Sequence, residues 1–217
     1  QHFTKERSIT EHCGRLIEDK YIPVINPGML AFKPEARETW DDALSKLKKY
    51  ISGELKSVKI DESKFYGITD TAEALAWVKA ARASNSPKVA VDTETTGLYP
   101  RDGYILGISM AVEDETAVYI STDCIDEEIV DEMQSMFREK GVIMHNAKFD
   151  LAMLEYHFNF EFPNIDDTML MSYMLNEVPG NHGLKQLAIK HTPYGDYEKP
   201  MYDFIAVSYT HLTLPTK

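Results

Sequence analysis

Val89-Ala90-Val91-Asp92-Thr93-Glu94-Thr95-Thr96-Gly97-Leu98 is the stretch that decides the fold: three apolar residues lead into two carboxylates, and a turn follows. In an extended strand alternate side chains share a face, so Asp92 and Glu94 should point the same way, roughly 7 Å apart. Two like charges on one face repel each other unless a cation neutralises them. The spacing therefore indicates a candidate metal site at a strand end, although solvated charges at the end of a strand would look the same.

A second stretch, Val142-Ile143-Met144-His145-Asn146-Ala147-Lys148-Phe149-Asp150, runs from an apolar strand into His-Asn and then an aspartate. Together the two stretches resemble the first two motifs of the DEDD family of 3′–5′ exonucleases, Asp-x-Glu and Asn-x-x-x-Asp. Two later stretches, residues 167–176 and 183–188, are similar to the proofreading domain of family A DNA polymerases. The resemblance covers about residues 65–204.

The order of apolar patterns predicts an α/β fold, a ribonuclease H-like mixed sheet flanked by helices. In it the strand of Asp92 is central, and the helix that carries Asp150 crosses the end of that strand. The expected strands cover residues 65–68, 88–93, 105–112, 117–120 and 142–145. The expected helices cover residues 40–52, 71–83, 127–140, 148–157, 168–176 and 183–191, with caps at Asp70 or Thr71 and at Asp167.

Two of these helices carry further expectations about side chains. In the amphipathic helix of residues 40–52, Leu44, Leu47 and Ile51 lie on one face. In the helix that follows Asp167, Tyr173 and Met174 lie at the spacing of core residues, so neither needs a functional role.

The chain divides into three expected parts. Residues 1–64 are read as an N-terminal extension or linker with one amphipathic helix, and residues 65–205 as a 3′–5′ exonuclease domain that is incomplete at its C-terminus. Residues 206–217 form a threonine-rich tail without acidic residues, which resembles translated vector sequence. The first residue is Gln1 rather than methionine, which suggests a processed or truncated start.

Composition limits the class of protein. With 43% hydrophobic and 11% aromatic residues the chain can bury a core. No apolar run approaches the roughly 18 residues that a membrane helix needs, so we expect no membrane span and an intracellular protein. The resemblance implies the cytoplasm of a bacterial or phage-infected cell. The two cysteines, Cys13 and Cys124, lie far apart and are expected to be unpaired thiols.

The net charge of −12 is unevenly distributed. Residues 1–70 hold 12 basic and 12 acidic residues, whereas residues 71–217 hold 11 basic and 23 acidic residues. This acidic part carries the motifs, so a tight non-specific grip on duplex is excluded. Capture of a single-stranded DNA 3′ end through metals and a few base contacts is compatible with this negative charge. Affinity for long nucleic acid would come from elsewhere, such as a polymerase domain of the same parent chain.

The resemblance implies roles for three carboxylates. Asp92 would bridge two divalent metal ions, Mg²⁺ or Mn²⁺, Glu94 would help to hold the metal on the nucleophile side, and Asp150 would hold the other. Hard cations prefer carboxylate oxygens, which matches a site without cysteine or histidine.

The resemblance also implies substrate contacts. Leu98 would lie against the terminal base, or it is a turn residue packed on the core. Thr95 and Asn146 would lie near the terminal nucleotide, or they form hydrogen bonds within the turn and at the helix start. His145 is interpreted as structural, and Lys148 as an exposed lysine of the first helical turn that could also touch phosphate.

The family's fourth carboxylate, in Tyr-x-x-x-Asp on a late helix, is missing from its expected place. The pairs that match the pattern elsewhere are Tyr66 with Asp70, Tyr119 with Asp123 and, with histidine as the base, His191 with Asp196. The first two pairs lie on or beside strands, and the third lies in a loop that contains proline and glycine. We therefore expect an interrupted fragment that binds metal weakly and hydrolyses DNA poorly.

Three functional hypotheses follow. The leading one is a 3′–5′ exonuclease domain that proofreads for a family A DNA polymerase and hydrolyses the 3′-terminal phosphodiester bonds of DNA with two metals. A ribonuclease D-like exonuclease acting on RNA 3′ ends is the second. The third is a non-catalytic domain of the same fold that binds a nucleic-acid end or a partner protein.

Overall fold

The computed structural model describes residues 13–14, 16–17, 20–53, 61–114, 116–177 and 182–192. The chain forms two compact units, one made of residues 1–59 and 185–217 and the other of residues 60–184. The predicted tail of residues 206–217, and Asp196 of the histidine variant motif, lie outside the described residues.

The first unit contains two short 3-10 helices, η1 (Pro27–Ala31) and η2 (Pro34–Ala36), and helix α1 (Arg37–Ile51), which matches the expected amphipathic helix. Ala43 is the fully buried residue of α1, while Leu44 and Leu47 are half-buried. Ile51, which the sequence places on the same face, is 76% exposed. Ile51 is the last helical residue and leads into an exposed turn, so no packed surface remains beside it.

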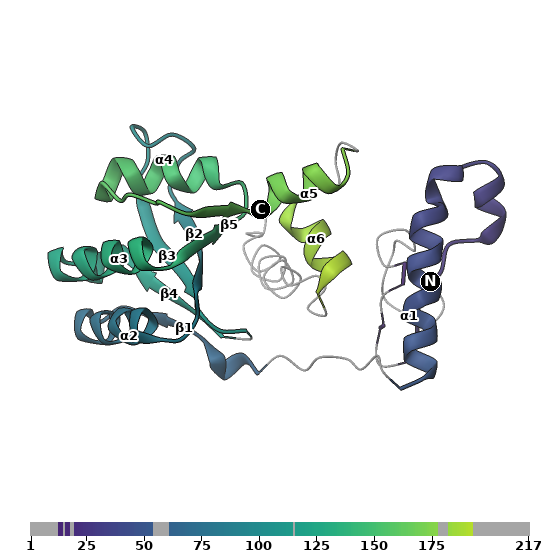
Figure 1. The fold of residues 1–217 in the computed structure, drawn as a ribbon, viewed down its shortest axis with the longest axis horizontal. Coiled ribbons are helices and arrows are strands. Elements are labelled where there is room, and N and C mark those ends of the chain that lie inside the picture. The colour runs from purple at the N-terminus through teal and green to yellow at the C-terminus, as the bar shows by residue number, and fades with distance from the viewer. Residues whose placement is uncertain are drawn as a thin grey trace, which may run out of the picture. The chain divides into compact units, whose positions relative to one another are not determined.

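The second unit is built on one six-stranded mixed sheet with the order β1-β4-β3-β2-β5-β6 (Figure 1). Its strands are β1 (Phe65–Ile68), β2 (Lys88–Thr95), β3 (Ile105–Ala111), β4 (Ala117–Ser121), β5 (Gly141–Met144) and β6 (Ile165–Asp167). Strand β2 pairs antiparallel with β3 and parallel with β5. The α/β class and the interior position of the Asp92 strand are therefore confirmed.

One hydrophobic core lies between the sheet and the helices α2 (Thr71–Ala83), α3 (Glu127–Glu139) and α4 (Ala147–Phe158). Helices α2 and α3 begin at aspartate caps: Asp70 accepts a hydrogen bond from the Glu73 N–H, and Asp126 accepts one from the Ile129 N–H. Short 3-10 turns, η3 (Glu62–Lys64) and η4 (Thr122–Cys124), complete the segment up to α3. Cys13 and Cys124 are both free thiols, as expected.

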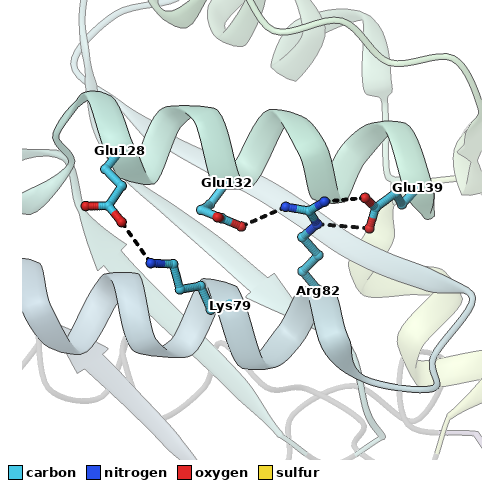
Figure 2. Close-up of polar contacts among 5 residues, drawn as sticks. All are labelled: Lys79, Arg82, Glu128, Glu132 and Glu139. Atoms are coloured by element: carbon cyan, nitrogen blue, oxygen red, sulfur yellow. Dashed lines mark hydrogen bonds and ion pairs between the residues drawn. The ribbon is translucent and has the colours of Figure 1, made fainter.

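Helices α2 and α3 lie side by side and are joined by ion pairs along their exposed edge (Figure 2). Lys79 Nζ lies 2.8 Å from Glu128 Oε1. Arg82 contacts two carboxylates: its Nη1 lies 2.9 Å from Glu132 Oε2, and its Nε and Nη2 both donate to Glu139. These contacts fix the relative position of two helices that cover the core.

Two features at the end of the unit were not predicted. Strand β6 is only three residues long and carries two aspartates, so no strand pattern reveals it; it pairs parallel with β5. Helix α5 (Thr168–Leu175) follows at once, and none of its residues is buried. The expectation that Tyr173 and Met174 are core residues is therefore wrong, since they are 49% and 85% exposed. A further helix, α6 (Leu184–His191), ends the described part of the chain.

Candidate active site

The centre of the candidate site is the second half of β2. Burial alternates along the strand, so that Val89, Val91 and Thr93 face the core while Asp92 and Glu94 are on the opposite, exposed face. In the register with β3, Asp92 lies opposite Ser109 and Glu94 lies opposite Gly107. The predicted common orientation of the two carboxylates is thus produced by the pleat of an interior strand.

Helix α4 brings the third carboxylate to this strand. Asp150 lies in its first turn and is 3% exposed. Its Oδ1 accepts hydrogen bonds from the Thr93 N–H, at 3.0 Å, and from the Thr93 hydroxyl, at 2.7 Å. Asp150 is therefore attached to the residue that separates Asp92 from Glu94. The sequence patterns gave Thr93 no role, because its partner is 57 residues away.

The three carboxylates influence one another electrostatically. Loss of hydration, together with the negative charges of Asp150 and Glu94, raises the pKa of Asp92 to about 6. Burial also raises the pKa of Asp150, while its two hydrogen bonds from Thr93 act in the opposite direction. Since the Asp92 side chain still reaches solvent, a cation could approach it and relieve this crowding.

The start of α4 is held by Asp167 rather than by its own N-cap. Asn146 adopts a left-handed conformation with φ of 62° and makes no side-chain capping bond. Instead Asp167 accepts from the N–H groups of Asn146, at 3.1 Å, and Ala147, at 2.9 Å. It also accepts from Met169 and Leu170 at the start of α5, as the sequence predicted. One carboxylate therefore caps two helices, and these bonds lower its pKa.

The residues assigned to substrate contacts lie on the segments that follow β2 and β5. The Thr95 hydroxyl donates to the Gly97 carbonyl at 2.9 Å, which is the turn-stabilising alternative considered for it. Leu98 is 76% exposed, so it does not pack on the core. Asn146 is also exposed, and its amide is not used at the helix start. Lys148 is exposed in the first turn of α4.

His145 fills the space between β5 and α5. Its Nδ1 lies 2.8 Å from the Thr168 hydroxyl, which itself donates to the Met144 carbonyl. Burial lowers the pKa of the His145 ring. Its Nε2 is buried and has no hydrogen-bond partner among the described residues.

The donor set suits a hard divalent cation in kind, since it consists of carboxylate oxygens on a crowded, partly solvated surface. Within the described ranges, however, no group of three or more His, Cys, Asp and Glu side chains is already arranged to hold a metal ion. In particular, one carboxylate oxygen of Asp150 already accepts hydrogen bonds from Thr93.

None of the helices described is long and apolar enough to cross a bilayer.

Comparison with known proteins identifies the family. The model of a family described as 3′–5′ exonuclease matches residues 65–200. The DNA polymerase of Escherichia phage T5 is 34% identical over 209 residues, which cover 91% of this chain and 24% of that protein. DNA polymerase I of Rhizobium leguminosarum is 28% identical over 168 residues, covering 63% and 16%. The chain thus spans a quarter or less of these two relatives.

Solved structures support the fold. The EXO domain of Aedes aegypti Nibbler superposes with a TM-score of 0.51 at 12% identity, covering 63% of this chain and 72% of that one. A mutant of the catalytic core of RRP6 from Trypanosoma brucei gives a TM-score of 0.50 at 15% identity, covering 62% and 36%. With its six-stranded mixed sheet and the match over residues 65–200, the chain belongs to the 3′–5′ exonuclease family found in DNA polymerases.

Proposed function

We propose that the chain is the proofreading exonuclease domain of a family A DNA polymerase, which removes nucleotides from the 3′ end of single-stranded DNA. The observation that carries the proposal is that Asp150 and Glu94 lie close enough to Asp92 for their negative charges to add to the effect of burial, which raises the pKa of Asp92 to about 6. Relatives that are named DNA polymerases support the choice of DNA and of a parent chain with a polymerase domain. By the same analogy it acts in the cytoplasm of a bacterial or phage-infected cell.

In this proposal Asp92, Glu94 and Asp150 would supply the carboxylate oxygens that hold two divalent metal ions. Two Mg²⁺ or Mn²⁺ ions would supply an activated water and neutralise charge on the scissile phosphate. The other residues of the site hold the metal-binding carboxylates in position. Thr93 orients Asp150, and Asp167 fixes the start of the helix that carries it.

Thr95, Leu98 and Asn146 are proposed to contact the terminal nucleotide. The support is their position at the strand ends and the exposure of Leu98 and Asn146, which leaves both side chains accessible to a ligand. An apolar side chain such as Leu98 can pack against the face of any base, so it would bind ends without regard to sequence.

The first test is an exonuclease assay on the 217-residue chain with a 5′-labelled oligonucleotide in Mg²⁺. Shortening from the 3′ end that is lost in Asp92→Asn, and in EDTA, would support the proposal. A matched pair of DNA and RNA substrates of one sequence distinguishes proofreading from the ribonuclease D-like alternative, which predicts faster loss of the RNA.

A non-catalytic domain is the second candidate, and the absence of a ready-made three-ligand cluster in the described part of the chain favours it. Calorimetry with Mn²⁺ separates the two. A heat of binding that disappears in Asp92→Asn, whose side chain keeps its size but loses its charge, supports a metal enzyme. No heat in either protein, with no hydrolysis, would leave the binding domain as the better account.

A further inference from the structure

An open pocket of about 500 Å³ lies at the end of the sheet where β3 begins and β4 ends. Its volume falls in the range of small-ligand pockets. The lining residues come from β3 and the loop before it, from β4 and η4, and from the end of α4; they are Tyr104, Ile105, Leu106, Tyr119, Ser121, Thr122, Asp123, His157 and Phe158. None of them has an assigned role in the proposed chemistry.

Tyr119 connects this pocket to the carboxylates. Its ring lies flat against Gly107, since a Cβ atom on that glycine would come within 2.2 Å of the ring and 2.4 Å of the hydroxyl oxygen. Gly107 is the residue opposite Glu94 in the pairing of β2 with β3. The phenol of Tyr119 is thus carried over β3 toward Glu94. Burial raises the pKa of Tyr119, and the negative charges of Glu94 and Asp123 add to the shift. Only glycine at position 107 allows this placement.

The chemistry of the lining selects the kind of ligand. Aromatic rings supply flat apolar surfaces, and the Tyr104 ring is 60% exposed and therefore free to stack on a planar group. The Ser121 hydroxyl and the Asp123 carboxylate offer an acceptor for N–H donors. No lysine or arginine is found among the lining residues described, and a carboxylate repels phosphate. The lining therefore suits an uncharged planar heterocycle with N–H groups rather than a phosphate.

We infer that this pocket binds a nucleobase of the DNA strand whose 3′ end reaches the carboxylates. The base would stack on Tyr104, and Tyr119 would form the side of the pocket that faces Glu94. The inference rests on the proposed function for the identity of the strand, since a nucleic-acid end at Asp92 would bring its bases within reach of Tyr119. Stacking on aromatic side chains tolerates every base, which suits an enzyme that degrades any sequence. Asp123 adds hydrogen bonds with N–H groups at the base edge.

The test measures binding of deoxyadenosine and deoxycytidine to the chain in EDTA by saturation-transfer NMR, so that neither metal nor phosphate takes part. Tyr104→Leu should weaken binding about five-fold or more, the loss typical of one stacking contact. Tyr99→Leu is the matched control, because Tyr99 is 68% exposed on the same loop but does not line the pocket. Asp123→Asn should also weaken binding, while Asp92→Ala should leave it unchanged.

Two results would overturn the inference: equal binding to the Tyr99 and Tyr104 variants, or displacement of the nucleoside by inorganic phosphate. Failure of the proposed function is recognised separately. If the chain neither binds Mn²⁺ nor shortens DNA, yet binds deoxynucleosides in a Tyr104-dependent manner, the pocket stands and the catalytic assignment falls. The reverse outcome, with hydrolysis but no nucleoside binding, rejects only the pocket.

Discussion

Asp150 and Thr93 form the hydrogen-bonded connection between the helix and the strand of the candidate site. Both Thr93 donors, the N–H and the hydroxyl, reach the same oxygen of Asp150, and both residues are buried. A helix-borne carboxylate is thereby positioned on the strand that carries Asp92. This contact explains how two segments 57 residues apart come together at the candidate site.

The first prediction concerns this contact. Thr93→Val keeps the shape of the side chain but removes the hydroxyl donor, so a buried carboxylate loses one of its two hydrogen bonds. We expect the free energy of unfolding to fall by about 1–3 kcal/mol, measured in urea at pH 7. Thr116→Val is the control, because its hydroxyl donates to the Glu113 carbonyl on an exposed turn and should matter little. An equal effect of both substitutions would mean that the Asp150 contact adds nothing.

The second prediction concerns pH. Because the pKa of Asp92 is raised from 3.8 to about 6, the folded protein holds a proton that the unfolded chain releases between these values. Stability from this group is therefore greatest at low pH and is lost as pH rises through about 6. Asp92→Asn removes the penalty, so in EDTA its Tm should exceed that of the wild type at pH 7.5, and the difference should vanish toward pH 4.

Addition of Mg²⁺ gives the matching control for the second prediction. A cation that binds Asp92 stabilises only the wild-type protein, so the difference in Tm at pH 7.5 should shrink or reverse. If Asp92→Asn is no more stable than the wild type at pH 7.5 in EDTA, the carboxylates do not repel each other as the structure indicates.

The third prediction concerns Asp167, which caps two helices at once. Asp167→Asn retains only one acceptor oxygen for four N–H donors, so it should cost more stability than Asp126→Asn, which affects the single cap of α3. Asparagine caps a helix about as well as aspartate, so Asp126→Asn should cost little, whereas Asp167→Asn loses the Oδ2 acceptor of the Ala147 N–H and should cost about 1 kcal/mol. Urea unfolding of the two variants measures the difference.

Metal binding shows whether Asp167 also matters to the site. Since the lost bonds fix the start of α4, Asp167→Asn should weaken Mn²⁺ binding in calorimetry several-fold, while Asp126→Asn should leave it unchanged. Equal Mn²⁺ affinities in the two variants would make Asp167 a stabilising cap without influence on the carboxylates.

Local patterns predicted most of this fold because each element carries its own signal. The alternation around Asp92 located β2, and aspartate caps located α2 and α5. The failures have physical causes. Strand β6 is too short for a pattern and exists because β5 pairs with it. Tyr173 and Met174 have the spacing of core residues, but α5 has no buried residue.

The site was predictable only in part for the same reason. Motif residues such as Asp92 and Asp150 are visible in the sequence, whereas their supports arise from long-range contacts. Asp167 reaches Asn146 across 21 residues, and Tyr119 approaches Glu94 only because the strand register puts Gly107 between them. Nothing in the sequence near Tyr119 indicates that neighbour.

The last prediction concerns the ion pairs between α2 and α3 (Figure 2). Arg82 is bound by two carboxylates and has a side chain that is 33% exposed, whereas Lys79 makes one pair and is 47% exposed. Arg82→Leu should therefore lower thermal stability more than Lys79→Leu does. Because salt screens such pairs, the gap between the variants should narrow from 0.05 M to about 1 M NaCl in thermal unfolding. Both variants should keep the Mn²⁺ affinity of the wild type, since the pairs involve none of the carboxylates of β2 and α4. A loss for Arg82→Leu that is independent of salt would point to packing of its side chain on the helices instead of charge.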